Sequence, residues 1–167
     1  MRLGRAPLAI LGAALLVAVA ATDAGAASRR DAAVLQGLYQ RSLDLSQALT
    51  EAESGGVSQL NASGDPQALD CLETLREAAS EVSDQLLDVR DVASLAAGLH
   101  GARDRRQGAA ATRAAAGRAL DVLPAEARQV NQTAGLCLTQ ATVQQKARDE
   151  AKLIDDATAA LQPLAGR

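Results

Sequence analysis

The sequence predicts an all-α fold, an up-and-down four-helix bundle closed by one disulfide. Three observations lead to this prediction. Alanine and leucine, which are strong helix formers, dominate the 167 residues. The β-branched and aromatic residues that strands favour are scarce, because Phe and Trp are absent, Tyr39 is the one aromatic residue, and Ile154 is the one isoleucine beyond the N-terminal segment. Four stretches of the chain place apolar residues at helical spacing, and two cysteines are available for a crosslink.

The N-terminal segment has the pattern of a secretory signal peptide. Arg2 and Arg5 supply the positive start, an apolar run begins at Leu8, and Ala24-Gly25-Ala26 fits the small-residue cleavage site. The apolar run has about 14 residues, fewer than the roughly 20 that a membrane-spanning helix needs. A retained membrane anchor is therefore the less favoured alternative.

This assignment sets the domain organisation. We expect a signal peptide over residues 1–26 and a single helical-bundle domain over residues 27–167. The mature protein is expected to be secreted to the extracellular space or apoplast, or to the periplasm if the host is a bacterium. No later apolar run approaches the length of a membrane span, so no membrane contact is expected after cleavage.

The first helical stretch is predicted over residues 31–53. Four leucines fall on one of its faces, namely Leu35, Leu38, Leu45 and Leu49. Gly55-Gly56 ends the pattern, and a polar linker leads to Asp65-Pro66, which suits an N-cap and first helical position.

The second stretch, residues 66–97, carries the clearest pattern in the chain. Its apolar positions repeat at alternating steps of three and four: Leu72, Leu75, Ala79, Val82, Leu86, Val89 and Ala93. Its acidic positions share the opposite arc: Asp70, Glu73, Glu77, Glu81, Asp84, Asp88 and Asp91. This acidic face is a candidate surface for a basic partner, and the alternative is a solvated face that keeps the bundle soluble.

The second half of the chain is harder to divide. The glycine-bounded basic stretch 98–108 is interpreted as a turn or loosened helix end, and helical pattern resumes at Ala109. Pro124 either kinks this third helix or starts a new one. The boundary before the last helix is placed at 131–135 or near Lys146.

The two cysteines are interpreted as one disulfide, Cys71–Cys137, because secretion implies an oxidising compartment. A free or intermolecular thiol is the alternative. Residues that face each other across an antiparallel hairpin lie equally far from its turn, and the midpoint of positions 71 and 137 is position 104, inside the basic stretch. A hairpin that turns near Asp104 would bring the Cα atoms within the roughly 7 Å that a disulfide requires.

The segment Ala68-Leu69-Asp70-Cys71-Leu72-Glu73-Thr74-Leu75-Arg76-Glu77-Ala78-Ala79-Ser80-Glu81-Val82 resembles the second helix of the plant invertase and pectin methylesterase inhibitor domain. Thr133-Ala134-Gly135-Leu136-Cys137-Leu138 is similar to that family's second cysteine site. The resemblance implies a secreted four-helix bundle in which a cysteine of the second helix bonds to one at the end of the third. It also implies a protein inhibitor without catalysis of its own, which occludes the cleft of a cell-wall carbohydrate enzyme. The family's two further cysteines and the Pro-Lys-Phe motif of its invertase-inhibiting members have no counterpart here.

Composition argues against other functions. The net charge of −3 and the single Tyr disfavour nucleic-acid binding. His100, the one histidine, has no partner at metal-ligand spacing, so we expect no metal, no cofactor and no catalytic residues. Arg103, Arg105 and Arg106 could bind an anion or pair with nearby acids.

The expected partner is a protein, pectin methylesterase or a related cell-wall enzyme, bound by a monomer. The rival expectation is a bacterial periplasmic helical-bundle binding or adaptor protein that inhibits nothing. Asn61 and Asn131 begin possible glycosylation sequons.

Overall fold

The computed structural model describes residues 29–55 and 66–166. These residues form four helices: an N-terminal helix over residues 29–55, α2 (Pro66–Ala97), α3 (Ala102–Leu136) and α4 (Ala141–Ala165). No strand occurs within these two ranges. The predicted fold class is confirmed.

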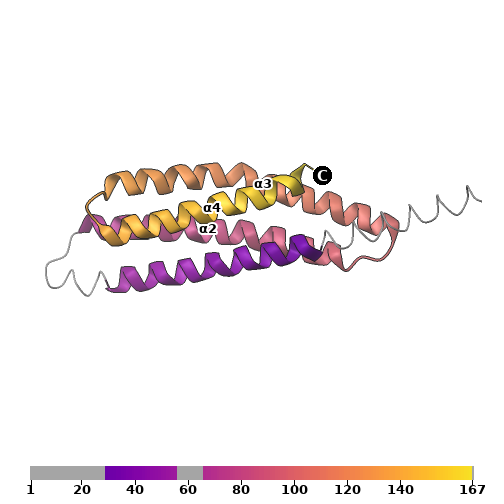
Figure 1. Cartoon of the computed structure of the whole chain (residues 1–167), viewed down its shortest axis with the longest axis horizontal. Coiled ribbons are helices and arrows are strands. Elements are labelled where there is room, and N and C mark those ends of the chain that lie inside the picture. Colours follow the sequence, from indigo (N-terminus) through magenta and orange to yellow (C-terminus); the bar gives the residue numbers. More distant parts are fainter. Residues whose placement is uncertain (1–28, 56–65, 167) are drawn as a thin grey trace, which may run out of the picture.

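The helices run alternately up and down, so that neighbours along the chain are antiparallel (Figure 1). Helix α3 packs extensively on both α2 and α4, whereas α2 and α4 touch less and lie diagonally. The N-terminal helix closes the ring through ion pairs to α2, Arg76–Glu53 at 3.0 Å, and to α4, Arg41–Asp156 at 2.8 Å. The hairpin of α2 and α3 projects beyond the end of α4 (Figure 1).

The core consists of leucine, valine and alanine, with one isoleucine and the two cysteines. Every apolar position predicted for the first two helices is buried. The first half of α3 contributes only alanines and a glycine to the interior: Gly108, Ala115, Ala116 and Ala119. Small side chains let helices approach closely but bury less apolar area each, so the leucines provide most of the hydrophobic stabilisation.

One buried polar contact joins the N-terminal helix to α2. The Ser42 hydroxyl donates to the carbonyl of Tyr39 at 2.7 Å and lies 2.7 Å from the Ser83 hydroxyl. Because Ser42 has a single proton to give, Ser83 is the donor in the second bond. Both hydroxyls are thereby partnered inside the core, which avoids the cost of an unsatisfied buried group.

The turn between α2 and α3 is shorter than predicted. It occupies residues 98–101, and α3 begins at Ala102, so the arginines of the basic stretch lie in the first turns of a helix. The interpretation of the stretch 98–108 as a turn or loosened helix end is therefore correct for residues 98–101 and wrong for residues 102–108. Residues after Gly101 are good helix formers, and Asp104 places a negative charge in the first turn, where the helix dipole favours it.

The boundary between α3 and α4 also differs from both predicted positions. The chain breaks at residues 137–140, and neither 131–135 nor Lys146 interrupts a helix. Pro124 lies inside α3, so the alternative in which it starts a new helix is wrong. Gly135 does not interrupt α3. The helix ends at Leu136, and the next residue, Cys137, lies beside Cys71.

Gly108 of α3 lies near the α2–α3 turn, where it closely approaches Ala96 of α2 and Leu99 of the turn. A Cβ atom there would lie 2.9 Å from Ala96 Cβ and 2.8 Å from Leu99 Cδ1, closer than carbon atoms pack. We expect Gly108→Ala to destabilise the protein by about 1–3 kcal/mol through overpacking, although alanine is the better helix former.

Gly117, on the same helix, provides the matched control. No atom lies within 4 Å of a Cβ built there. Gly117→Ala should therefore stabilise the protein by up to about 1 kcal/mol through helix propensity. Thermal unfolding of both variants measures the difference, and an equal stabilisation by both substitutions would show that Gly108 has no packing role.

Candidate functional site

The disulfide joins the beginning of α2 to the end of α3. The Cα atoms of Cys71 and Cys137 are 6.7 Å apart, and both residues are buried. Within the described residues neither cysteine is free, so the free-thiol alternative does not describe this structure. Cys137 is the C-cap of α3, which places the bond at the end of the bundle opposite the α2–α3 turn.

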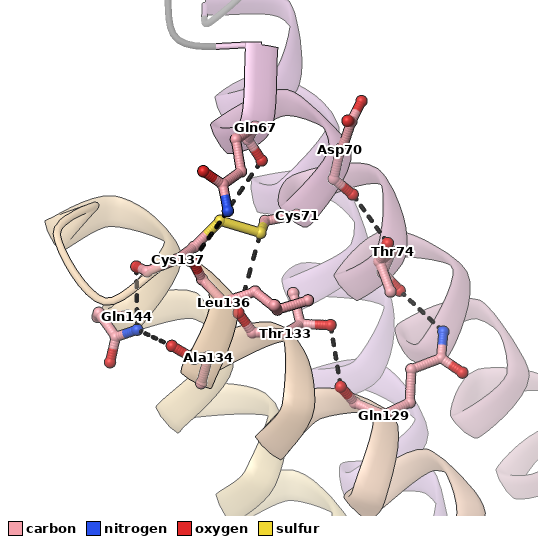
Figure 2. Close-up of a disulfide and its surroundings, with 10 residues drawn as sticks. All are labelled: Gln67, Asp70, Cys71, Thr74, Gln129, Thr133, Ala134, Leu136, Cys137 and Gln144. Atoms are coloured by element: carbon pink, nitrogen blue, oxygen red, sulfur yellow. Dashed lines mark hydrogen bonds between the residues drawn. A yellow bond between two sulfur atoms is a disulfide. The ribbon is translucent and has the colours of Figure 1, made fainter.

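Glutamine side chains from two other helices cap the end of α3 around this bond (Figure 2). Gln67 of α2 donates to the carbonyl of Leu136 at 3.1 Å. Gln144 of α4 donates to the carbonyls of Ala134 and Cys137 at 2.6 and 3.1 Å. These bonds satisfy carbonyls that a helix end leaves without partners, and they fix the α3–α4 connection against the disulfide.

The acidic face of α2 is largely exposed. Six of its seven predicted residues have exposed side chains: Asp70, Glu73, Glu77, Asp84, Asp88 and Asp91. Two of these are paired, Asp88 with Arg118 of α3 at 2.9 Å and Asp91 with its neighbour Arg90 at 2.6 Å. The remaining four form no cross-helix ion pair among the described residues, which leaves their charge available to solvent or to a partner.

Glu81 differs from the other members of the acidic face. Its side chain is half-buried, and its carboxylate accepts a hydrogen bond from Gln85 at 2.8 Å. It lies close enough to Glu126 of α3 to affect that carboxyl: burial raises the pKa of Glu126, and the charge of Glu81 raises it further. Glu81 thus belongs to the α2–α3 boundary rather than to the outward surface.

The other predicted positions lie at the surface where the structure describes them. His100 and the arginines Arg103, Arg105 and Arg106 are exposed at the projecting end of the α2–α3 hairpin. Asn131 is exposed on α3, whereas Thr133 of the same sequon is buried and donates its hydroxyl to the carbonyl of Gln129 at 2.9 Å. Asn61 lies outside the described residues.

Sequence reasoning missed the most unusual polar residue of the core, Glu150 of α4. Its side chain has 0% exposure, and neither carboxyl oxygen has a hydrogen-bond partner. Burial raises the pKa of Glu150 to about 8, and the charge of Glu126 contributes to this shift. Its position in α4 could have revealed it, because Glu150 follows Val143 and Ala147 at the same steps of three and four that place Ile154 and Ala157 in the core.

No other arrangement suggests catalytic or metal chemistry in the part of the chain that the structure describes. No group of three or more His, Cys, Asp or Glu side chains there could hold a metal ion. The N-terminal helix and α4 enclose a shallow, open depression lined by Arg41, Asp44, Leu45, Asp149, Lys152 and Leu153. Among the described helices, none is both long and apolar enough to cross a membrane.

These features define a class of protein, a disulfide-linked four-helix bundle with an acidic outer face and a buried carboxyl. Comparisons with family models, with curated proteins and with solved structures give no match to this chain.

Proposed function

We propose that this chain is a secreted protein-binding bundle that inhibits pectin methylesterase or a related cell-wall enzyme by occluding its cleft. The observation that carries the proposal is the position of the disulfide. The resemblance implies a bond from the second helix to the end of the third, and Cys71 of α2 is bonded to Cys137 at the C-cap of α3. The Asp70-Cys71 pair that carries the resemblance lies at this bond.

The bundle is suited to binding as a rigid body. The disulfide and the glutamine caps hold α2, α3 and α4 together at one end, and the buried Ser42–Ser83 contact holds the N-terminal helix on α2. A surface that is ordered before binding loses less conformational entropy in the complex. The exposed carboxylates of α2 would steer this surface toward a basic rim on the partner.

The second candidate function is a periplasmic binding or adaptor protein without inhibitory activity. One observation favours it: no cysteine precedes Cys71, whereas the inhibitor family usually has two in an N-terminal hairpin. The acidic face of α2 would serve this function equally well, since it too requires a protein partner.

A capture experiment separates the two functions. The oxidised mature protein is immobilised and exposed to a plant cell-wall extract, and residual pectin methylesterase and invertase activities are assayed in parallel. Capture of an enzyme with dose-dependent loss of its activity supports the inhibitor. If no enzyme is captured and no activity is lost while the disulfide is intact, the inhibitor function is contradicted and the adaptor function remains.

The acidic face can be tested separately by charge reversal. Glu73→Lys combined with Glu77→Lys changes two exposed, adjacent positions of α2. If this face meets the partner, we expect association to slow by about tenfold or more at low salt and the difference to shrink at high salt. Surface plasmon resonance against the captured partner measures both rates.

The control places the same change of net charge elsewhere. Asp121→Lys combined with Asp155→Lys alters exposed positions of α3 and α4. Equal slowing in both double variants would indicate that net charge, and not the α2 face, governs association.

A further inference from the structure

Glu150 lies where a charged carboxylate is poorly tolerated. Both of its oxygens are buried without a hydrogen-bond partner, in a core of leucine, valine and alanine. An ionised carboxylate in such a site loses its hydration and gains nothing in return, so the group keeps its proton. The buried Glu150 carboxyl is not used by the function proposed above.

The charged groups around Glu150 make ionisation still less favourable. From α3 the facing group is Glu126, whose negative charge opposes a second one. From α2, Glu81 faces Glu126 in turn. Counted from the disulfide, Glu81 and Glu126 lie at similar height in antiparallel α2 and α3, so three helices bring acidic side chains to one level of the bundle.

The N-terminal helix also brings charged side chains to α4. Arg41 pairs with Asp156 there, and Asp44 lines the shallow depression with Asp149 and Lys152. Neither side chain provides Glu150 with a hydrogen bond, since both of its carboxyl oxygens lack a partner.

We propose that Glu150 is a proton-controlled latch that holds α4 on the α2–α3 hairpin: α4 docks while this carboxyl is protonated and is released when it ionises. The latch acts on α4 because the other two helices are linked covalently. The Cys71–Cys137 bond holds α2 to α3, whereas α4 is joined to them by the short connection 137–140, by hydrogen bonds from Gln144 and by apolar packing.

The direction of the pH effect follows from the shifted proton affinity. Burial raises the pKa of Glu150 from its ordinary value of 4.5 to about 8 in the docked state, while an undocked or unfolded α4 exposes the group to water. The docked state therefore binds this proton more tightly. The stabilisation of the docked state by this proton is complete below the ordinary pKa and is lost as the pH rises toward 8. Across that range the equilibrium constant for release of α4 grows by about tenfold per pH unit.

The test compares wild-type protein with Glu150→Gln, which keeps the shape of the side chain but cannot ionise. Native-state hydrogen exchange, corrected for the intrinsic effect of pH, measures the opening of each helix. In the wild type we expect α4 to lose protection by about tenfold per pH unit between pH 6 and pH 8 while α2 loses less. In Glu150→Gln this tenfold dependence should be lost, and only the smaller contribution of the Glu126 carboxyl should remain.

Two further variants make the result specific. Asp155→Asn removes an exposed carboxylate of the same helix and should retain the wild-type dependence. Glu126→Gln removes the facing charge, so the loss of α4 protection should end at lower pH and be smaller in total. An identical pH dependence in wild type and Glu150→Gln would overturn the proposal.

A measurement on the wild type alone covers the case in which Glu150→Gln fails to fold. Infrared spectroscopy of the folded protein at pH 7 should show the carbonyl band of a buried protonated carboxyl, and this band should vanish as the pH rises past about 8. Absence of the band at pH 7 would show that Glu150 is already ionised in the docked bundle, which contradicts the latch.

Discussion

Replacing Cys71 and Cys137 together by alanine is expected to lower the free energy of unfolding by about 4 kcal/mol. The two cysteines are 66 residues apart in the sequence, so their bond removes a large amount of loop-closure entropy from the unfolded chain. This loss should be a large part of the free energy of unfolding, because the core has no Phe or Trp and consists mainly of alanine over much of α3. Urea denaturation followed by far-UV circular dichroism measures it.

Reduction of the wild-type protein is the natural control for this variant. The reduced wild type should unfold at nearly the same urea concentration as the double alanine variant, because both lack the crosslink and keep a small apolar side chain at each position. A difference of less than about 1 kcal/mol between oxidised and reduced protein would mean that the bond contributes little beyond the packing of the bundle.

Leu86→Ala is expected to destabilise the protein by about 2–5 kcal/mol. Leu86 has 0% exposure on the inner face of α2, so its truncation leaves a cavity bounded by helices that can close only partly around it. The same denaturation experiment measures the effect, and Leu95→Ala serves as its control.

Leu95 is on the same helix but 74% exposed. Its replacement should change the free energy of unfolding by no more than about 0.5 kcal/mol, since little buried area is lost and alanine suits a helix. Similar losses in the two variants would contradict the assignment of the inner and outer faces of α2.

Helix α2 shows what could be predicted from the sequence. Its bounds, Pro66 and Ala97, and its buried face were both predicted, because Pro66 marks a first helical position and the apolar and acidic residues separate cleanly around the helix. The N-terminal helix follows the same logic and extends two residues further than predicted at each described end. Where apolar residues repeat regularly and helix-ending residues flank them, the sequence alone predicts both the bounds and the buried face of a helix.

Helix α3 shows where such reasoning fails. Its first half has few large apolar residues, so the periodicity that would reveal a helix is weak, and the glycines near its start are typical of a turn. Gly108 is instead present because Ala96 and Leu99 of the α2–α3 hairpin leave no room for a Cβ. The distance between two packed helices depends on tertiary structure, and the local residue pattern of either helix does not reveal it.

The site was predicted in the same uneven way. The pairing of Cys71 with Cys137 is confirmed, since a chain with two cysteines offers one intramolecular pairing. Glu81 was assigned to the acidic face by angle alone, yet the neighbouring α3 half-buries it beside Glu126. Glu150 was missed because a lone acid on an amphipathic helix is normally solvated, and only the packed bundle shows that it lacks a partner.

The proposed inhibition requires the oxidised bundle to bind its partner as a folded protein. The activity of purified pectin methylesterase is titrated with the oxidised protein and, in parallel, with the double alanine variant under conditions where that variant is unfolded. We expect a saturable loss of activity that reaches its limit at one bundle per enzyme and requires the folded chain. Full enzyme activity in the presence of excess folded, oxidised protein would contradict it.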